Sequence, residues 1–276
     1  MEIRSAVDFY ERHPISCAII LAKLAASRGH LDGLVPEELF PHDQDHYGGL
    51  AANDALAQRA GIGPGTRVVD FCAGLGGPAR YLAQRHGADV TGIELALARV
   101  RGAEELTRRV GLQDKVRIIG GDVRQVPLAD ASVDVVISQE ALLHVPDKPR
   151  VLAEAYRILK PGGRLVFTDW VAHFPLSEAD RELMWQGMAV TELYDLPAYA
   201  AVISRAGFVV GAEDLTAEWG AILTQRLAMY RRLREETQAA GTPAGHDAFY
   251  ESYVRFVDLV NAGMLGGGQF VGRKPA

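Results

Sequence analysis

Cysteine is nearly absent from this 276-residue chain, whose two cysteines are Cys17 and Cys72. Two cysteines are too few for a disulfide framework or a structural zinc site, so we expect a reducing, cytoplasmic compartment. Positive charge is also in deficit, because 29 Lys and Arg residues face 35 Asp and Glu residues and leave a net charge of -6. An acidic surface repels phosphate backbones, which argues against nucleic acid as a partner.

Targeting signals and long apolar runs are missing as well. The start of the chain lacks the basic-then-apolar order of a signal peptide. The apolar stretch 15–26 is interrupted by Lys23 and is too short to span a bilayer, so we expect no membrane partner. The chain is nevertheless long enough, and with 48% hydrophobic residues apolar enough, to bury a full core.

Short β-rich runs alternate with helical patterns through the middle of the sequence. The expected strands are 67–71, 89–94, 115–119, 133–137 and 164–168. Between them, apolar residues recur at helical spacing over 78–85, 96–110 and 148–159. Strands that alternate with helices predict an α/β fold, in which helices cover both faces of a mostly parallel sheet.

The flanking regions have a different pattern. Residues 1–60 read as mainly helical, with a loop through 29–47, and further helices are expected over 177–206 and 216–262. A short strand is expected at 208–210 and a last one at 269–274, which we place at the sheet edge. The flanking helices either only pack on the sheet or also form a lid over the carboxyl ends of the strands, where open α/β sheets bind ligands.

A glycine-rich turn directly follows the first expected strand. Residues 74–79, Gly-Leu-Gly-Gly-Pro-Ala, also match the dinucleotide fingerprint G-x-G-x-x-A. Glycines at this point let a ligand approach the backbone over a helix N-terminus. Asp70 precedes the turn, and a carboxylate there would oppose the pyrophosphate of NAD but suit an ammonium or sulfonium group. Asp70 could also hold the loop through backbone N–H groups.

Acidic residues also stand at or just after the ends of the next two strands. Glu94 can accept hydrogen bonds from both ribose hydroxyls of an adenosine ligand, which fits NAD and S-adenosylmethionine equally. Asp122 could accept from an adenine amino group, and the backbone N–H of Val123 could meet a ring nitrogen. Each residue alone could be an ordinary turn or cap residue, but three acids on three successive strand ends predict an adenosine site.

With these motifs the sequence resembles the class I S-adenosylmethionine-dependent methyltransferases. The resemblance covers about 51–169 well, and its further motifs are 138–147, 161–163 and 267–274. Within the family, the chain is most similar to the small-molecule group of sarcosine/dimethylglycine and other amine N-methyltransferases. The resemblance implies a Rossmann-like sheet, mostly parallel with an antiparallel last strand, flanked by helices. It divides the chain into an N-terminal helical cap, 1–60, and a methyltransferase domain, 61–276, with lid insertions around 175–206 and 216–262.

The resemblance also implies which residues bind S-adenosylmethionine. These residues are Asp70, Ala73, Gly74, Gly76, Glu94, Leu95, Arg99, Asp122, Val123 and Gln139. The sequence departs from the family where Cys72 and Ala73 stand in place of the usual Gly-Cys or Gly-Ser. A Cβ at position 72 narrows the space beside the methionyl end of the cofactor, whereas Gly74 and Gly76 remain.

Acceptor-side candidates come from the fourth and fifth strand ends and from the N-terminal region. His144 is the best candidate for a general base, but packing beside the cofactor or capping the following segment is the favoured role for it. The candidate substrate-binding residues are Tyr10, His46, Tyr47, Glu140, Asp169 and Trp170. Aromatic rings suit a cationic sulfonium or amine, but aromatic residues in flanking helices are also common core residues.

The sequence therefore predicts an enzyme that transfers a methyl group from S-adenosylmethionine to a small-molecule acceptor, with an amine nitrogen as the first choice. O- or C-methylation of a natural-product or prenyl-type acceptor is the alternative. An NAD-dependent oxidoreductase and a non-catalytic binding protein remain as further readings, and homodimerisation stays open. The run 42–46 superficially suggests a metal site, but neighbouring ligands in one loop are poor support, and we expect no metal.

Overall fold

A single seven-stranded sheet organises the chain in the computed structural model, which describes residues 5–11, 13, 15–44, 46–239 and 247–276. The strand order is β3-β2-β1-β4-β5-β7-β6. The strands are β1 (Arg67–Phe71), β2 (Asp89–Glu94), β3 (Val116–Gly120), β4 (Val133–Gln139), β5 (Leu159–Ala172), β6 (Val209–Asp214) and β7 (Leu265–Arg273). All pairs are parallel except those of β7 with β5 and β6, so the expected α/β fold with an antiparallel last strand is confirmed.

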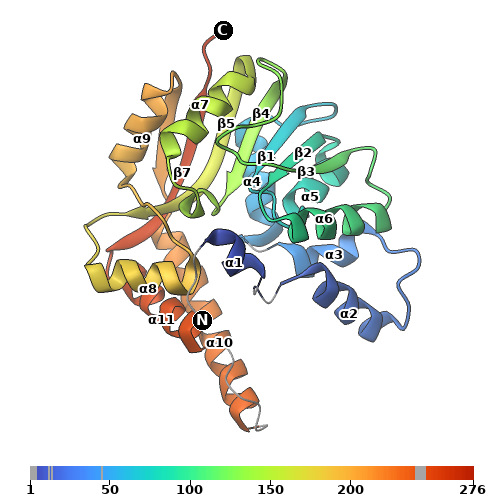
Figure 1. Cartoon of the computed structure of the whole chain (residues 1–276), viewed down its shortest axis with the longest axis vertical. Helices are drawn as coiled ribbons and strands as arrows, with labels where there is room; N and C mark the ends of the chain where they lie inside the picture. The colour runs from blue at the N-terminus through green and yellow to red at the C-terminus, as the bar shows by residue number, and fades with distance from the viewer. Residues whose placement is uncertain (1–4, 12, 14, 45, 240–246) are drawn as a thin grey trace.

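Helices lie on both faces of the sheet and beyond its carboxyl edge (Figure 1). They are α1 (Ala6–Glu11), α2 (Cys17–Arg28), α3 (Pro36–Asp43), α4 (Gly49–Ala60), α5 (Gly77–His86), α6 (Leu97–Arg109), η1 (Leu142–His144), α7 (Lys148–Ile158), α8 (Glu178–Met188), α9 (Leu196–Arg205), α10 (Thr216–Ala239) and α11 (Asp247–Asn261). Within the described residues, no helix is both long and apolar enough to cross a membrane.

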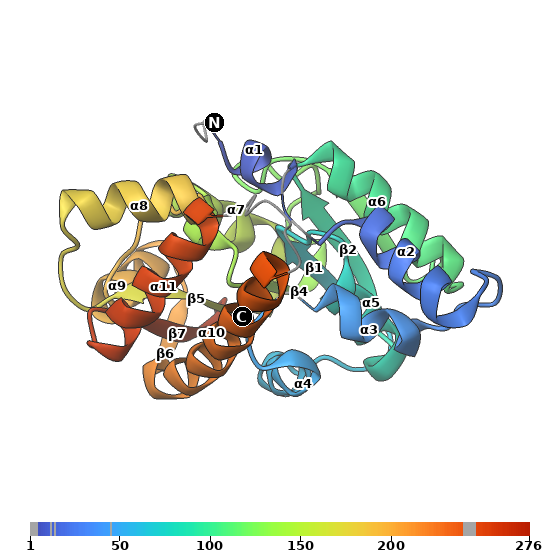
Figure 2. The same ribbon diagram turned by 90° about the horizontal axis from the view of Figure 1, so that it is seen from below.

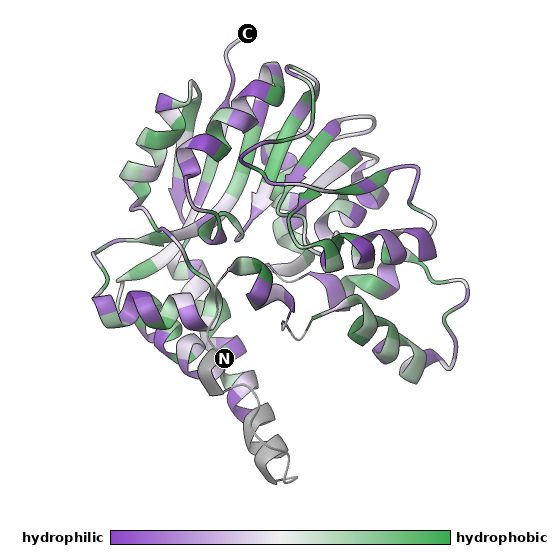
Figure 3. Ribbon diagram, in the orientation of Figure 1, coloured by the Kyte–Doolittle hydropathy of each residue, from purple (hydrophilic) through white to green (hydrophobic). Residues whose placement is uncertain are grey.

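The apolar strands have two buried faces because neighbouring side chains on a strand point to opposite sides. In β1, Val68 packs with α4, α5 and α6, whereas Val69 and Phe71 pack with α7 and α9. In β5, Val166 and Phe167 divide between the same two layers. Figure 3 shows the result as apolar central strands surrounded by helices whose outer faces are more polar.

The place of the last strand differs from the expectation. We expected it at the sheet edge, but β7 lies between β5 and β6, and β6 forms the edge. Glycines allow α10 to cover β7 closely, because a Cβ at Gly267 would lie 2.3 Å from Cδ2 of Trp219. An inner strand and an edge strand with one covered face have similar apolar patterns, so the sequence did not distinguish them.

Helix α3 occupies part of the region expected to be a loop. Pro36 stands in the first turn of α3, where a missing N–H costs nothing, and the Glu38 carboxylate accepts from the backbone N–H of Val35. Leu39 and Phe40 of the same helix are buried against the rest of the protein. Helix capping and these apolar residues therefore outweigh the proline, glycine and histidine content that suggested a loop.

Two groups of helices meet at the carboxyl edge of the sheet. Figures 1 and 2 place α2 and α3 beside the β1–β3 half and α8, α10 and α11 beside the β5–β7 half, with α1 between them. Trp170 from β5 packs in one apolar cluster with residues of α8, α10 and α11, including Met188 and Phe256. Segments from both ends of the chain thus come together where the parallel strands end.

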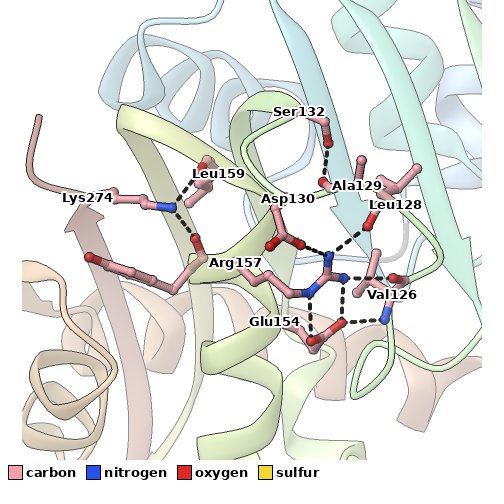
Figure 4. Close-up of polar contacts among 10 residues, drawn as sticks. Val126, Leu128, Ala129, Asp130, Ser132, Glu154, Arg157, Leu159 and Lys274 are labelled. Atoms are coloured by element: carbon pink, nitrogen blue, oxygen red, sulfur yellow. Dashed lines mark hydrogen bonds and ion pairs between the residues drawn. The ribbon is translucent and has the colours of Figure 1, made fainter.

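Arg157 fastens the long connection between β3 and β4 (Figure 4). Its guanidinium donates to the carbonyls of Val126 and Leu128 and to the carboxylates of Asp130 and Glu154, at 2.7–3.0 Å. Glu154 in turn accepts from the backbone N–H of Val126 at 2.7 Å. One side chain therefore satisfies several otherwise unpaired groups of this connection.

Replacing Arg157 by Ala is expected to lower the free energy of unfolding by about 2–3 kcal/mol, because the largely buried Glu154 carboxylate and the two carbonyls lose their partner. Chemical denaturation measures this loss. Arg255→Ala is the control, because its pair with Asp180 is exposed on the arginine side and should contribute at most about 1 kcal/mol. Equal losses in the two variants would contradict a special role for Arg157.

Candidate active site

A cavity of 540 Å³ opens where the carboxyl ends of β1, β2, β4 and β5 meet the flanking helices. Its wall contains residues from the glycine loop, the strand ends, α1, α8, α10 and α11. The volume lies in the range of ordinary small-molecule sites. The cavity therefore occupies the ligand position that is general to open α/β sheets.

The end of β1 presents a buried carboxyl group to this cavity. Asp70 is 5% exposed, and its side chain forms no hydrogen bond or ion pair with another described residue. Burial and the nearby Glu94 carboxylate raise the pKa of Asp70 to about 8. A buried carboxyl without a cationic partner is costly, so this position favours a positively charged ligand.

The glycine loop follows Asp70 with left-handed backbone at several residues. Cys72, Gly74 and Gly76 have φ of 60°, 55° and 74°. Cys72 lines the cavity in this conformation despite its Cβ, at the position where the resemblance implied a glycine. At Gly77, an added Cβ would lie 2.0 Å from the carbonyl oxygen of Asp43, so the last residue of α3 packs directly on the first turn of α5, where the glycine loop ends.

Glu94 connects the glycine loop to the end of β2. Its Oε2 accepts from Gly74 N at 2.9 Å and its Oε1 from Ala96 N at 2.8 Å. Each carboxylate oxygen can accept more than one hydrogen bond, so Glu94 keeps capacity toward the cavity that it lines.

Asp122 also lines the cavity, after β3, where it is paired with Arg124. The guanidinium and the backbone N–H of Arg124 donate to its carboxylate at 2.6–3.1 Å. Hydrogen bonding from Arg124 holds the pKa of Asp122 below its ordinary value. The Asp122 carboxylate is therefore ionised, and Arg124 uses part of its capacity to accept hydrogen bonds. The sequence analysis did not predict this pairing.

A hydrogen-bonded chain runs from α1 through η1 to the segment after α8. Tyr10 Oη lies 2.8 Å from His144 Nε2, and His144 Nδ1 lies 3.1 Å from the carbonyl oxygen of Ala189. A carbonyl only accepts, so Nδ1 carries the proton and Nε2 accepts from the Tyr10 hydroxyl. Burial lowers the pKa of His144 to about 4, which keeps the ring neutral at physiological pH.

Glu140 joins the N-terminal region to the strand ends. Its Oε2 accepts from Tyr47 N at 2.6 Å and its Oε1 from the Thr168 hydroxyl at 2.5 Å. Burial raises the pKa of Glu140 to about 7, opposed by the hydrogen bonds from Thr168 and Tyr47. The backbone of Glu140 is left-handed, with φ 45°, a strained conformation of the kind that clusters at functional sites.

The cavity gathers most of the residues that the sequence analysis singled out. Those on its wall are Tyr10, His46, Tyr47, Asp70, Ala73, Gly74, Glu94, Leu95, Arg99, Asp122, Val123, Gln139, Glu140, His144 and Trp170. Gly76 lies outside the wall, at the N-terminus of α5. Asp169 also lies outside it, because both of its oxygens accept hydrogen bonds from Leu143 N and the Tyr199 hydroxyl. The suggested metal run includes Asp45, which is outside the described residues.

Sequence reasoning missed several wall residues. Phe9 and His13 come from the N-terminal region, Met188 from α8, Arg226 from α10 and Tyr253 from α11. The guanidinium of Arg226 donates to the carbonyl of His46, and its Cζ lies 4.9 Å from the centre of the Tyr47 ring. Nothing in the local sequence of α10 marks Arg226, since its role depends on how the helix docks.

The sequence of the chain is similar to sequences of known proteins. Residues 69–167 match the family described as a methyltransferase domain. Over 105 residues the chain is 41% identical to sarcosine/dimethylglycine N-methyltransferase of Aphanothece halophytica, which covers 38% of each protein. Residues 69–167 therefore belong to this methyltransferase-domain family, and the chain spans less than half the length of the first N-methyltransferases it matches.

Solved structures share the fold of this chain over nearly its whole length. Phosphoethanolamine N-methyltransferase 2 of Haemonchus contortus, in complex with phosphomonomethylethanolamine and S-adenosylhomocysteine, gives a TM-score of 0.80 at 24% identity, over 99% of this chain and 61% of that one. The [4+2]-cyclase SpnF gives 0.74 at 19% identity, over 100% and 99%. The chain thus spans only part of the N-methyltransferases it matches, and its fold also occurs in a cyclase.

Proposed function

We propose that this methyltransferase transfers a methyl group from S-adenosylmethionine to a small-molecule acceptor, with an amine nitrogen as the target. Asp70 supplies the observation that carries the proposal. Its buried, unpaired carboxyl suits the ammonium group of the cofactor, and ion pairing would convert a costly buried group into a binding contact. The buried Oε1 of Gln139, which also has no partner among the described residues, offers a second acceptor nearby.

The remaining cofactor contacts follow the wall of the cavity. Glu94 would accept from the ribose hydroxyls, and Asp122 with the backbone of Val123 would hold the adenine. When bound, S-adenosylmethionine supplies an electrophilic methyl group. A pyrophosphate would instead meet the Asp70 carboxyl, so the same residues argue against NAD.

The acceptor would lie between Tyr10, Glu140 and Trp170 on the opposite part of the wall. The Tyr10 hydroxyl donates a hydrogen bond to His144 Nε2. Its oxygen is therefore oriented to accept from an N–H of the acceptor amine, which would direct the lone pair of the amine nitrogen toward the methyl group. Aromatic and apolar side chains, including Met188 and Tyr253, exclude water around the reacting atoms. Alignment of this kind is sufficient for a neutral amine, which needs no strong base.

We further propose that residues 1–60 act as a cap and that the insertions around 175–206 and 216–262 act as a lid. Tyr10 and Tyr47 reach the cavity from the first region, and Met188 and Arg226 from the other two. We assign the protein to the cytoplasm, a placement consistent with its two unpaired cysteines.

The proposal is tested first by calorimetric titration with S-adenosylhomocysteine, with NAD in a parallel cell. We expect micromolar binding of the first ligand and none of the second. A labelled-methyl assay then compares amines, hydroxyl compounds and prenyl-type carbon acceptors, and we expect N-methylated products. Hydride transfer with NAD would refute the cofactor assignment. Binding without turnover across the panel would refute methyl transfer, and O- or C-methylated products would refute the amine assignment.

Glu140→Gln is expected to raise the KM of an amine acceptor about tenfold and to leave cofactor affinity within about twofold. A glutamine can accept from Tyr47 N and donate to the Thr168 oxygen, so it removes the charge but keeps both contacts. Because the pKa of Glu140 is about 7, the native protein should show an additional fall in the KM of an amine acceptor as pH rises through 7 and Glu140 ionises, and Glu140→Gln should lack this additional fall. Thr168→Val, which keeps the charge, is the control, and an unchanged KM in Glu140→Gln would exclude acceptor binding by Glu140.

A further inference from the structure

The Nδ1 side of His144 is held by a segment that contributes no catalytic group of its own. Residues 189–192 follow α8, and Ala189 presents its carbonyl oxygen to Nδ1 from a left-handed conformation, with φ 52°. A non-glycine residue adopts this conformation only at some cost, so its surroundings must hold it there. The contacts that hold residues 189–192 in place therefore also keep the Ala189 carbonyl beside Nδ1, and so determine the tautomer of His144.

Two residues near His144 tie the segment down. The carbonyl oxygen of Leu143 accepts from both the backbone N–H and the hydroxyl of Thr191, at 2.9 and 2.8 Å. Lys148, at the start of α7, donates from Nζ to the carbonyl oxygen of Glu192 at 2.5 Å. Residues 189–192 and η1 thus form one hydrogen-bonded unit around the imidazole.

Asp169 holds the other side of this unit. Its Oδ1 accepts from Leu143 N at 3.0 Å and its Oδ2 from the Tyr199 hydroxyl at 2.9 Å. Asp169 and Lys148 are both 0% exposed. Burial raises the pKa of Asp169 to about 6, and the positive charge of Lys148 is the largest influence that opposes this rise, although the two side chains form no direct ion pair and are joined through the 189–192 segment and Leu143.

We propose that Asp169 and Lys148 are positioning residues that act through Leu143 and the 189–192 segment to keep His144 in the Nδ1–H tautomer. The opposite tautomer would place a proton on Nε2, where it would donate to Tyr10 and reverse the chain. The Tyr10 oxygen would then no longer be oriented to accept from the acceptor. The inference rests on the proposed function for its catalytic consequence, but the tautomer itself does not depend on turnover.

Asp169→Asn isolates the charge of this network. The amide oxygen can still accept from Leu143 N and the amide nitrogen can donate to the Tyr199 oxygen, so both contacts survive while the Lys148 ammonium loses its counter-charge. We expect kcat to fall about tenfold, with cofactor affinity within about twofold of native. NMR of ring-nitrogen-labelled histidine should show a single tautomer at His144 in the native protein and a mixture in the variant.

Three further variants separate positioning from a general loss of structure. Lys148→Met should produce the same tautomer mixture, and the double variant should be less impaired than the sum of the two, because it leaves neither charge unpaired. Tyr199→Phe removes one contact of Asp169 but keeps the charge, so it should retain the single tautomer. Signals are assigned with His144→Gln, and all spectra are recorded with S-adenosylhomocysteine present.

A single Nδ1–H tautomer in both Asp169→Asn and Lys148→Met would overturn the inference, whatever their stability. If no acceptor is ever methylated, the proposed function fails, whereas the tautomer spectra still decide this inference. Additive losses in the double variant would equally contradict a coupled pair.

Discussion

Replacing Asp70 by Asn is expected to weaken S-adenosylhomocysteine binding by at least about thirtyfold, because loss of one partner from a buried charge pair costs about 2–5 kcal/mol. S-adenosylhomocysteine retains the ammonium group for which we propose Asp70 as the partner. Calorimetric titration at pH 8, where the native carboxyl is substantially ionised, measures the change.

The same substitution should stabilise the ligand-free protein. The pKa of Asp70 is about 8 when folded, compared with about 3.9 for an ordinary aspartate, so the folded state holds a proton that the unfolded chain releases between these values. The stability of the native protein therefore falls as pH rises from 4 to 8. Asn carries no such proton, and its advantage can reach about 4 kcal/mol at pH 7. Thermal unfolding without ligand measures this gain.

A ligand ammonium must also displace the proton of Asp70, so native affinity should rise by up to about tenfold per pH unit between pH 6 and 8. Asp70→Asn should lose this slope. Asp89→Asn is the control. Asp89 lies at the start of β2, at the end of the strand away from the cavity, and it pairs with Lys115 on the surface. Native-like affinity in a folded Asp70→Asn variant would remove Asp70 from the cofactor site.

The part of the cavity wall where we propose the cofactor could be predicted from the sequence, because it depends on strand ends. Parallel strands end at a common edge, so a carboxylate after each of β1, β2 and β3 converges on one place without further information. Asp70, Glu94 and Asp122 therefore reach the cavity as expected. The pairing of Asp122 with Arg124, two residues away, is a local feature that the sequence analysis overlooked.

The part of the wall where we propose the acceptor could be predicted only in part, since its residues depend on how helices dock. Arg226 and Met188 reach the wall through the packing of α10 and α8, which no local pattern specifies. Asp169 was expected there together with Trp170, but neighbours on a strand point to opposite faces. Trp170 faces the cavity and packs with α8, α10 and α11, whereas Asp169 turns to Leu143 and Tyr199.

Tyr10→Phe and His144→Gln are each expected to lower kcat by at least about a hundredfold, the lower end of the range for groups that direct proton positions. Phe keeps the ring that stacks at 4.3 Å from the Arg99 guanidinium, so cofactor affinity should change little in that variant. Rapid-quench measurement of the methyl-transfer step with both substrates saturating separates this effect from binding. Turnover unaltered in His144→Gln would exclude His144 from the chemistry.

The pH dependence of kcat provides an independent check on the chain. Because the pKa of His144 is about 4, its neutral form persists above pH 5, and kcat should show no limb from an ordinary histidine near pH 6.5. If Tyr10 and His144 act as one hydrogen-bonded unit, the double variant should be no slower than the slower single variant. Independent contributions would instead multiply, which would mean that the 2.8 Å contact between Tyr10 Oη and His144 Nε2 does not align the acceptor.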